Sequence, residues 1–311
     1  MRAVFFGTSA FAVPSLERLA ASRHTVLACV TQPDRPQGRG LAREPSPVKQ
    51  AALRLGLRLE QPERLDAAQL APLAPDVGVV AAYGNMIRPA LLALPARGML
   101  GVHPSLLPKY RGAAPVTWAI LNGETQIGVT IFRLNERLDA GAILRRQAVA
   151  IGPEEHAGLL LERLAELGAD ELLSALDAIE EGRETAVPQE EAHATFAPKL
   201  TKAHGRIDWQ TPADVIGRLV RATVPWPGAT TEWQGRPLRV WAASAHAAGS
   251  RASAPAGTAV AVGDGIITVS AGQGTAVDLL EVQPSGRRRM SVREFLAGHP
   301  VRIGDRFGVR S

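Results

Sequence analysis

The 311-residue chain contains a single cysteine, Cys29, so it cannot form an internal disulfide. The residues around it, TVLACV, are apolar, which predicts a buried strand thiol in a reducing compartment. No apolar run approaches the roughly 20 residues that a membrane-spanning helix needs, and Gly7, Thr8 and Ser9 interrupt the apolar start MRAVFFGTSAFAV. We therefore expect a cytoplasmic protein that has no membrane partner.

The motifs of several enzyme classes are also missing. The seven histidines are scattered without an HExxH pattern and without paired cysteines, so we expect no metal. Neither GxGxxG nor a P-loop occurs, which gives little support to a dinucleotide or a nucleoside triphosphate. The nucleophile elbow GxSxG is absent as well, which disfavours acyl-enzyme chemistry on Ser105.

In the first part of the chain, short apolar runs alternate with amphipathic stretches. Near-continuous apolar runs predict strands that are buried on both faces, at 3–6, 26–31, 77–82 and 99–103. Helical periodicity fills the gaps, from Pro14 onward and at 48–55, 114–121 and 154–179. This alternation is typical of an α/β fold with a doubly wound, mostly parallel sheet.

The second part of the chain has a different pattern. An acidic segment with Pro188 and Pro198 shows no sustained period, which indicates an interdomain linker. After a short helix near 213–222, short runs separated by turn residues predict strands at 230–233, 238–242, 258–262, 266–270 and 277–282. We expect a first domain over 1–185, a linker over 186–206 and a small β-barrel over 207–311.

The basic residues are unevenly distributed. Residues 208–311 hold 12 arginines, no lysine and eight acidic residues, so most of the net charge of +5 lies there. Arg287, Arg288 and Arg289 stand together, and arginine makes bidentate contacts to phosphate, although a solvated charged face explains them equally well. Trp226, between two prolines, is expected to pack on a core or interdomain surface.

A second basic segment, QPDRPQGRGLAREPSPVK at 32–49, is too long for a plain connection. Its basic side chains would project into solvent and follow a phosphate backbone, or it is an ordinary surface loop. The basic residues of this segment are Arg35, Arg39, Arg43 and Lys49.

The most informative segment is GVHPSLLPKYRGAAP at 101–115. It places His103 at the end of a buried strand, where open α/β sheets bind their substrates. A histidine there exchanges protons near neutral pH or steadies an oxyanion, or it is simply structural. Downstream, LNERLDAG puts Asp139 after a strand at 129–134, where its carboxylate could meet His103 across the sheet edge.

Taken together, these segments resemble the methionyl-tRNA formyltransferase family, which uses 10-formyltetrahydrofolate to formylate the amino group of initiator methionyl-tRNA in translation initiation. The likeness spans nearly the whole chain, and its motifs are FFGTSAFAVPSLERL, TQPDRPQGRG with PSPVK, VVAAYG, HPSLLPKYRGAAP, GVTIFRLNERLDAG, KLTKAHGRIDW, VPWPG, LLEVQPSGRRRMSVREFLAG and GDRF. It implies a Rossmann-like formyltransferase domain followed by a C-terminal barrel that resembles an OB-fold and binds tRNA.

The resemblance also implies roles for residues. His103 and Asp139 match the family's catalytic pair, and the segment Ser105, Leu106, Leu107 and Pro108 matches its folate contact. The 32–49 loop resembles the one that meets the tRNA acceptor end, with Arg39 at the position of an important arginine. We expect a monomer that binds the folate co-substrate and the tRNA.

One departure stands out. Gly101 occupies the position of the family's usual Asn, an amide that helps to hold the formyl oxygen. Losing an oxyanion donor typically lowers the rate about 100- to 1000-fold. A backbone N–H or a water substitutes, Asn85 or Asn135 reaches the site, or the enzyme is weak. The alternative functions are a sugar-nucleotide formyltransferase, which should lack the basic loop, and a tRNA-binding homologue that has lost catalysis.

Overall fold

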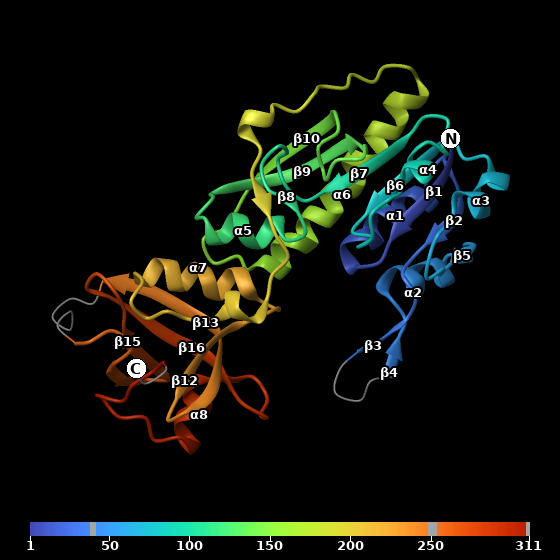
Figure 1. The fold of residues 1–311 in the computed structure, drawn as a ribbon. Helices are drawn as coiled ribbons and strands as arrows, with labels where there is room; N and C mark the ends of the chain where they lie inside the picture. Colours follow the sequence, from blue (N-terminus) through green and yellow to red (C-terminus); the bar gives the residue numbers. More distant parts are fainter. Residues whose placement is uncertain (38–41, 248–253, 309–311) are drawn as a thin grey trace. The chain divides into compact units, whose positions relative to one another are not determined.

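The computed structural model describes residues 1–37, 42–247 and 254–308 (Figure 1). The chain divides into two compact units, each of which is described by itself. The first takes in Met1–Pro115, Gln126–Ala150 and Leu161–Pro198. The second takes in Val116–Thr125, Ile151–Leu160 and Lys199–Ser311.

A seven-stranded sheet in the order β10-β9-β7-β6-β1-β2-β5 forms the frame of the first unit (Figure 1). The strands are β1 (Arg2–Gly7), β2 (Thr25–Val30), β5 (Leu59–Glu60), β6 (Val77–Ala81), β7 (Met99–His103), β9 (Gln126–Arg133) and β10 (Ile143–Ala150). The first five are mutually parallel, whereas β9 runs antiparallel to β7 and β10 antiparallel to β9. From β1 the chain first builds toward β2 and β5 and then returns to add β6 on the other side. This reversal creates the switch point at which such sheets bind ligands.

Both faces of this sheet are covered, which confirms the doubly wound, mostly parallel fold. On one face Val4, Phe6 and Met99 pack with Leu70 and Leu91 from two short helices. On the other face a long helix lies so close that a Cβ on its Gly168 would come within 2.9 Å of Val102. The helices that begin in this part of the chain are α1 (Val13–Ala20), α2 (Pro47–Arg54), α3 (Ala67–Leu70), α4 (Pro89–Leu92), α5 (Pro115–Leu121) and α6 (Ala157–Glu180).

Two small strand pairs accompany the main sheet. The segment that we expected to be a loop is partly a hairpin, because β3 (Arg35–Gln37) pairs antiparallel with β4 (Ala42–Glu44). Helix α2 then begins directly after Ser46, whose side chain caps it by accepting a hydrogen bond from the Lys49 N–H. The other pair joins β8 (Arg111–Gly112) in parallel to β11 (Phe196–Ala197), which lies in the expected linker.

The second unit is built on an antiparallel sheet in the order β12-β13-β16-β15-β14, with β17 paired to β16. Its elements are α7 (Ala213–Thr223), β12 (Ala229–Trp233), β13 (Arg236–Ala247), β14 (Ala259–Gly263), β15 (Ile266–Ser270), β16 (Thr275–Pro284), β17 (Met290–Ser291) and α8 (Val292–Gly298). The core inside it contains Trp209, Trp233, Phe295 and Phe307. This confirms a C-terminal domain built on an antiparallel β-sheet, with a helix near the expected 213–222.

The segment just before the end of the described chain closes this sheet. On one side the Gly308 N–H donates to the Glu232 carbonyl at 2.8 Å, and on the other side the Phe307 N–H donates to the Gly257 carbonyl at 2.7 Å. The segment with Phe307 and Gly308 thereby bridges the two edges of the sheet, at β12 and next to β14, and these two strands do not pair with each other. Closure of this kind protects strand edges and yields a barrel-like shape. Among the described residues, no helix is both long and apolar enough to span a bilayer.

Candidate active site

His103 is held in place by the strand that carries it. All five residues of β7 are buried between β6 and β9, because apolar side chains fill both sides of a central strand. The segment that follows is pinned to β9 through Thr130, whose hydroxyl donates to the Ser105 carbonyl at 2.7 Å and accepts from the Leu107 N–H at 3.1 Å. The imidazole therefore stands at the carboxyl end of the parallel strands on a rigid base.

The structure brings His103 and Asp139 together. The Nδ1 atom of His103 lies 3.8 Å from Oδ2 of Asp139, which is within reach of an ion pair but longer than a hydrogen bond. The other ring nitrogen, Nε2, lies 2.9 Å from the Tyr110 carbonyl oxygen. Since a carbonyl only accepts, Nε2 carries a hydrogen and Nδ1 is the nitrogen that can exchange a proton.

The turn after β9 positions Asp139. The Gly112 N–H donates to Asp139 Oδ2 at 2.8 Å, which fixes the carboxylate. The backbone of Asp139 is left-handed, with φ of +48°, an uncommon conformation for a residue with a side chain. Gly141 is required nearby, because a Cβ there would lie 1.6 Å from the Arg133 carbonyl oxygen. The LDAG segment is thus shaped to present one carboxylate oxygen to His103.

Gly101 faces an aromatic ring rather than open space. It pairs with Phe132 across β7 and β9, and a Cβ on Gly101 would lie 2.3 Å from Cε1 of that ring. The same ring meets His103 edge-on, with the ring centroids 6.4 Å apart. An aromatic residue that covers a cross-strand glycine is a known way to fill such a gap. Phe132 therefore occupies the space that a longer side chain at position 101 would need.

Neither asparagine that was considered as a substitute contacts His103 in the described structure. The side-chain oxygen of Asn85 accepts from Gln32 Nε2 at 3.5 Å, and that of Asn135 accepts from the Arg137 N–H at 2.9 Å. Of the alternatives from the sequence, two remain proposals: a backbone N–H or a water takes the role of the missing amide, or the enzyme is weak.

The segment that matches the folate contact divides into buried and accessible side chains. Ser105 is fully buried and donates to the Lys109 carbonyl at 2.6 Å, and Leu107 packs with Phe132 and Ile143. Leu106 and Pro108 are half-buried. A folate at this edge would therefore meet Leu106, Pro108 and the backbone, while Ser105 and Leu107 hold the loop.

Sequence reasoning missed a polar cluster that supports the Asp139 turn. Nε2 of Gln189 donates to the carbonyl oxygens of Asp139 and Gly141, both at 2.8 Å. Arg111, only 2% exposed, donates to Gln189 Oε1 at 2.8 Å and pairs with Glu191 at 2.9 Å. Hydrogen bonds from Arg111 first and Arg137 second lower the pKa of the Glu191 carboxyl to about 2. Arg111 lies inside the KYRG motif, whereas the segment that holds Gln189 carries no motif.

The basic residues of the 32–49 segment lie in different structural environments. Arg35 and Arg43 lie on the paired strands β3 and β4, and Arg39 falls outside the described residues. Lys49 differs from the expectation of a side chain that projects into solvent. It is about one-fifth exposed, and its Nζ lies 2.5 Å from Asp34 Oδ2. The reason is the ion pair with Asp34, which holds the ammonium group against the protein.

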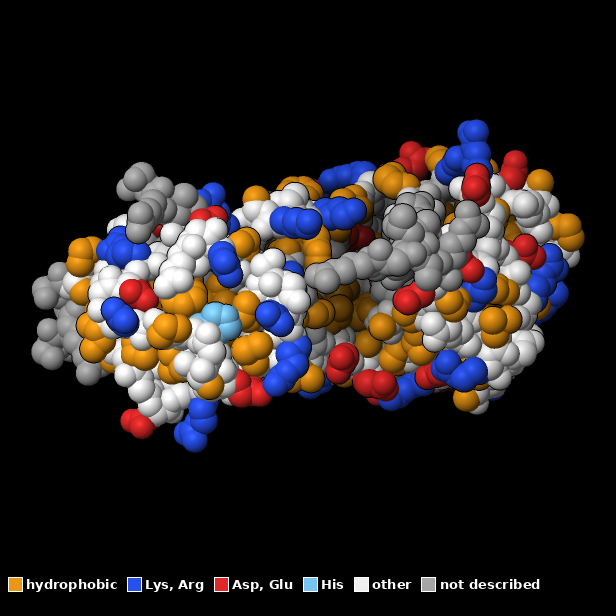
Figure 2. Space-filling model, turned by 90° about the horizontal axis from the view of Figure 1, so that it is seen from below, with side chains coloured by type: hydrophobic (Ala, Val, Ile, Leu, Met, Phe, Trp, Pro, Cys, Tyr) orange, Lys and Arg blue, Asp and Glu red, His pale blue; other side chains and the backbone are white. Residues whose placement is uncertain are grey.

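The three consecutive arginines of the second unit are exposed. Arg288 pairs with Glu294 at 2.7 Å, and Arg289 pairs with Glu281 while its guanidinium lies 5.1 Å from the centre of the Trp241 ring. Among the residues that the structure describes, the Arg287 side chain has no hydrogen bond or ion pair. Figure 2 shows basic side chains dispersed over one face among apolar and acidic ones. Trp226 is half exposed, so it is not a fully buried core residue, and its packing on a core or interdomain surface stays a prediction.

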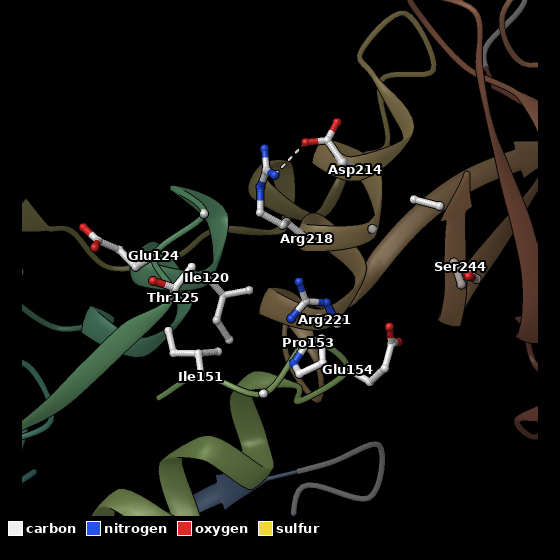
Figure 3. Close-up of a pocket in the computed structure, with 15 residues that line it drawn as sticks. Ile120, Glu124, Thr125, Ile151, Pro153, Glu154, Asp214, Arg218, Arg221 and Ser244 are labelled. Carbon is white, nitrogen blue, oxygen red and sulfur yellow. Dashed lines mark hydrogen bonds and ion pairs between the residues drawn. The ribbon is translucent and has the colours of Figure 1, made fainter. Parts of the chain in front are cut away.

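A cavity of about 330 Å3 lies in the second unit (Figure 3). Asp214, Arg218 and Arg221 line it from one face of α7, and Glu124 and Glu154 line it from two loops. Three carboxylates and two guanidinium groups therefore line the cavity, and Arg218 is paired with Asp214 at 2.7 Å. This balance of charge favours no anionic ligand, and none of the predicted site residues lines the cavity.

Two further groups bear on the expected chemistry. Burial raises the pKa of the Cys29 thiol to about 12, so this cysteine is a core residue, as predicted, and is not a nucleophile. Within the described ranges, His24, Asp177 and Glu180 bring potential metal-ligating atoms within 4.8 Å of one another. Arg23 pairs with both of these carboxylates, at 2.8 and 3.2 Å, so their charge is already balanced by a cation.

Comparison with known proteins adds to this geometry. Residues 1–176 match a family model described as "Formyl transferase", and residues 199–300 match one described as "Formyl transferase, C-terminal domain". A curated protein from Roseiflexus sp. (strain RS-1), named "Methionyl-tRNA formyltransferase", is 47% identical over 99% of this chain and 95% of its own length. Both halves of the chain thus have relatives of the same kind.

Solved structures share the fold at low sequence identity. An N-formyltransferase from Helicobacter canadensis, in complex with folinic acid and dTDP-3-aminofucose, aligns with a TM-score of 0.69 at 14% identity, over 91% of this chain and 98% of its own. HypX from Aquifex aeolicus, in complex with tetrahydrofolic acid, aligns with a TM-score of 0.63 at 19% identity. This chain is covered completely and spans about half of HypX, 51%. These likenesses show the fold.

Proposed function

We propose that this chain, which belongs to the methionyl-tRNA formyltransferase family, transfers the formyl group of 10-formyltetrahydrofolate to the α-amino group of initiator methionyl-tRNA. The observation that carries this proposal is the end-to-end match to curated methionyl-tRNA formyltransferases, which takes in both domains. The product begins protein synthesis, so we place the protein in the cytoplasm and expect it to act as a monomer.

His103 and Asp139 would move the protons of the reaction. The amine attacks the formyl carbon, a C–N bond forms, and the bond from that carbon to the folate nitrogen breaks. His103 takes the ammonium proton on Nδ1 and returns it to the leaving folate nitrogen, because Nε2 is already engaged by the Tyr110 carbonyl. Asp139 faces Nδ1 at 3.8 Å and steadies a proton on it. Since the part of the chain that the structure describes places no activated nucleophile beside this pair, the proposed transfer is direct.

The two substrates would meet different surfaces. Leu106 and Pro108 offer accessible apolar contacts for the folate beside His103. The tRNA would be held by phosphate contacts, at its acceptor end by the basic segment of Arg35, Arg39, Arg43 and Lys49 and elsewhere by Arg287, Arg288 and Arg289. Because phosphate contacts release counterions, binding should weaken steeply with salt.

A competition between acceptors tests this function. The purified protein is incubated with 10-formyltetrahydrofolate and either initiator methionyl-tRNA or a dTDP-linked amino sugar, and the formylated products are quantified. We expect formylmethionine and no formylated sugar. Formylation of the sugar alone would overturn the proposal in favour of a sugar-nucleotide enzyme. Binding of tRNA with no transfer to either acceptor would overturn it in favour of a tRNA-binding homologue.

A further inference from the structure

We propose that the segment 187–197, which lies in the expected interdomain linker, positions both members of the catalytic pair through the side chains of Gln189 and Thr195. This inference rests on the proposed function for the identity of the pair. The Gln189 side chain contacts the backbone of Asp139 itself, and the Thr195 side chain contacts the backbone of Tyr110, whose carbonyl is the partner of His103. Gln189 supports Asp139, and Thr195 supports His103 through Tyr110.

The first half of the argument concerns Asp139. Its left-handed backbone is strained for a residue with a side chain, and such a conformation persists only where its surroundings hold it. Gln189 supplies that restraint, because its single amide nitrogen donates to the carbonyls on either side of the turn, at Asp139 and Gly141. The amide itself is oriented by the buried Arg111, which donates to its oxygen through Nε at 3.1 Å and Nη2 at 2.8 Å.

The second half concerns His103. Its Nε2 donates to the carbonyl of Tyr110, and Tyr110 is also left-handed, with φ of +62°. The Thr195 hydroxyl accepts from the Tyr110 N–H at 2.9 Å. The Thr195 backbone brackets the same loop, since its N–H donates to the Pro108 carbonyl at 3.3 Å and its carbonyl accepts from the Arg111 N–H at 2.8 Å. The Thr195 hydroxyl thus holds the peptide unit before Tyr110, and the Thr195 carbonyl holds the unit after it, whose carbonyl oxygen receives His103 Nε2.

Two residues with a left-handed backbone, Asp139 itself and Tyr110 next to His103, are thus held by one short segment. The segment is also anchored at its start, where Val187 pairs with Ile143 at the beginning of β10. Strained backbone gathered at a site and stabilised by neighbouring residues is typical of catalytic preorganisation. The residues that follow lead directly into the second unit, which begins at Lys199. Gln189 and Thr195 are positioning residues, because neither side chain reaches the reacting groups.

The test uses substitutions that preserve shape. Thr195→Val removes the hydroxyl and keeps the volume, Thr195→Ser keeps the hydroxyl, and Gln189→Met removes the amide. Glu190→Gln is the matched control, since this exposed residue of the same segment pairs only with His193 among its described neighbours. Steady-state transfer to methionyl-tRNA gives kcat and the KM for each substrate, and NMR follows the titration of the His103 imidazole.

Because a misplacement of about 1 Å can cost about 100-fold in rate, we expect kcat to fall about tenfold in Thr195→Val and about 100-fold in Gln189→Met. The KM values should change little, the His103 titration midpoint should move in Thr195→Val, and Thr195→Ser and Glu190→Gln should match the wild type. The inference would be overturned if Thr195→Val and Gln189→Met both kept the wild-type kcat and the wild-type titration of His103. Equal losses of kcat in Thr195→Val and Thr195→Ser would overturn it too. If the wild type transfers no formyl group, the proposed function is refuted instead. The NMR titration of His103 in the variants then still tests whether the segment 187–197 positions this residue.

Discussion

The catalytic edge and the basic surfaces of this protein are organised in opposite ways. His103 is 6% exposed, and its ring nitrogens, its strand and the loop after it all have specific partners. Arg287, Arg288 and Arg289 are exposed, and two of them pair with carboxylates on the surface. The proposed site of chemistry is enclosed and held by specific contacts, whereas the surfaces proposed for tRNA are open and distributed.

This contrast follows from what each region has to do. A transition state is stabilised by groups that are already in place, so small displacements are costly. Phosphate contacts act through charge in solvent, where each contributes a little and salt weakens them together. Single substitutions should therefore have large effects at the catalytic edge and small ones on the basic surfaces.

The largest effect is expected from removing the catalytic pair. His103→Ala and Asp139→Ala should each lower kcat by about 100-fold or more, because acid–base catalysis by one group typically contributes about 100- to 10,000-fold. The affinity for methionyl-tRNA should stay near that of the wild type, since neither side chain lies on a basic surface. Single-turnover rates and filter binding measure the two quantities. A loss of tRNA binding equal to the loss of rate would contradict the assignment.

The next effect concerns Gly101. Gly101→Asn should lower the free energy of unfolding by about 1–3 kcal/mol, the usual cost of overpacking a core, because its Cβ would meet the Phe132 ring at 2.3 Å. Gly101→Asn combined with Phe132→Leu should recover part of that stability. Urea denaturation checks both variants. A fully stable single variant would show that the Phe132 ring moves aside freely.

The basic surfaces should respond weakly and additively. Arg39→Ala and Arg287→Ala should each weaken tRNA binding a few-fold and reduce the slope of log K against log salt by about one, without changing kcat at saturating tRNA. Titrations over a range of salt concentrations measure these slopes. Arg288→Ala, which also breaks a surface ion pair, is the comparison. If Arg39→Ala leaves both affinity and rate untouched, the assignment of this loop is wrong.

The smallest effect belongs to Glu191. Its folded-state pKa of about 2 lies below the ordinary value of 4.5, so its contribution to stability is present above pH 4.5 and is lost as the pH falls through about 2. As the pH falls from 4.5 to about 2, the free energy of unfolding of the wild type should therefore decrease more than that of Glu191→Gln. Urea denaturation at several pH values tests this. Parallel curves for the two proteins would contradict the ion pairs with Arg111 and Arg137.

The strongly periodic and apolar segments could be predicted closely from the sequence. Residues 99–103 and 266–270 form strands with the expected bounds. A short, continuous apolar run favours a strand that is buried on both faces of the sheet. Strand β10 was missed because Arg145, Arg146 and Gln147 interrupt its apolar pattern at the edge of the sheet. The hairpin of β3 and β4 was missed because Pro36 and the glycines indicate a loop.

The site was predictable only where a motif named its residues. His103 ends β7, whereas Asp139 lies in the turn between β9 and β10. Because β9 runs antiparallel to β7, with Arg133 opposite Leu100, it is this turn and not the strand order that returns Asp139 to His103. Gln189 and Thr195 act through backbone carbonyls and N–H groups that lie 48 to 85 residues away in the sequence, and no local pattern encodes such contacts. The role of Phe132 depends in the same way on cross-strand register, which pairs it with Gly101.

The most direct test of the account is single-turnover formylation at saturating 10-formyltetrahydrofolate and initiator methionyl-tRNA, by the wild type and by a variant that carries both His103→Ala and Asp139→Ala. We predict that the wild type produces formylmethionine and that the double variant binds the tRNA with little transfer. Full-rate transfer by the double variant, or no transfer by the wild type while it binds tRNA, would contradict the account.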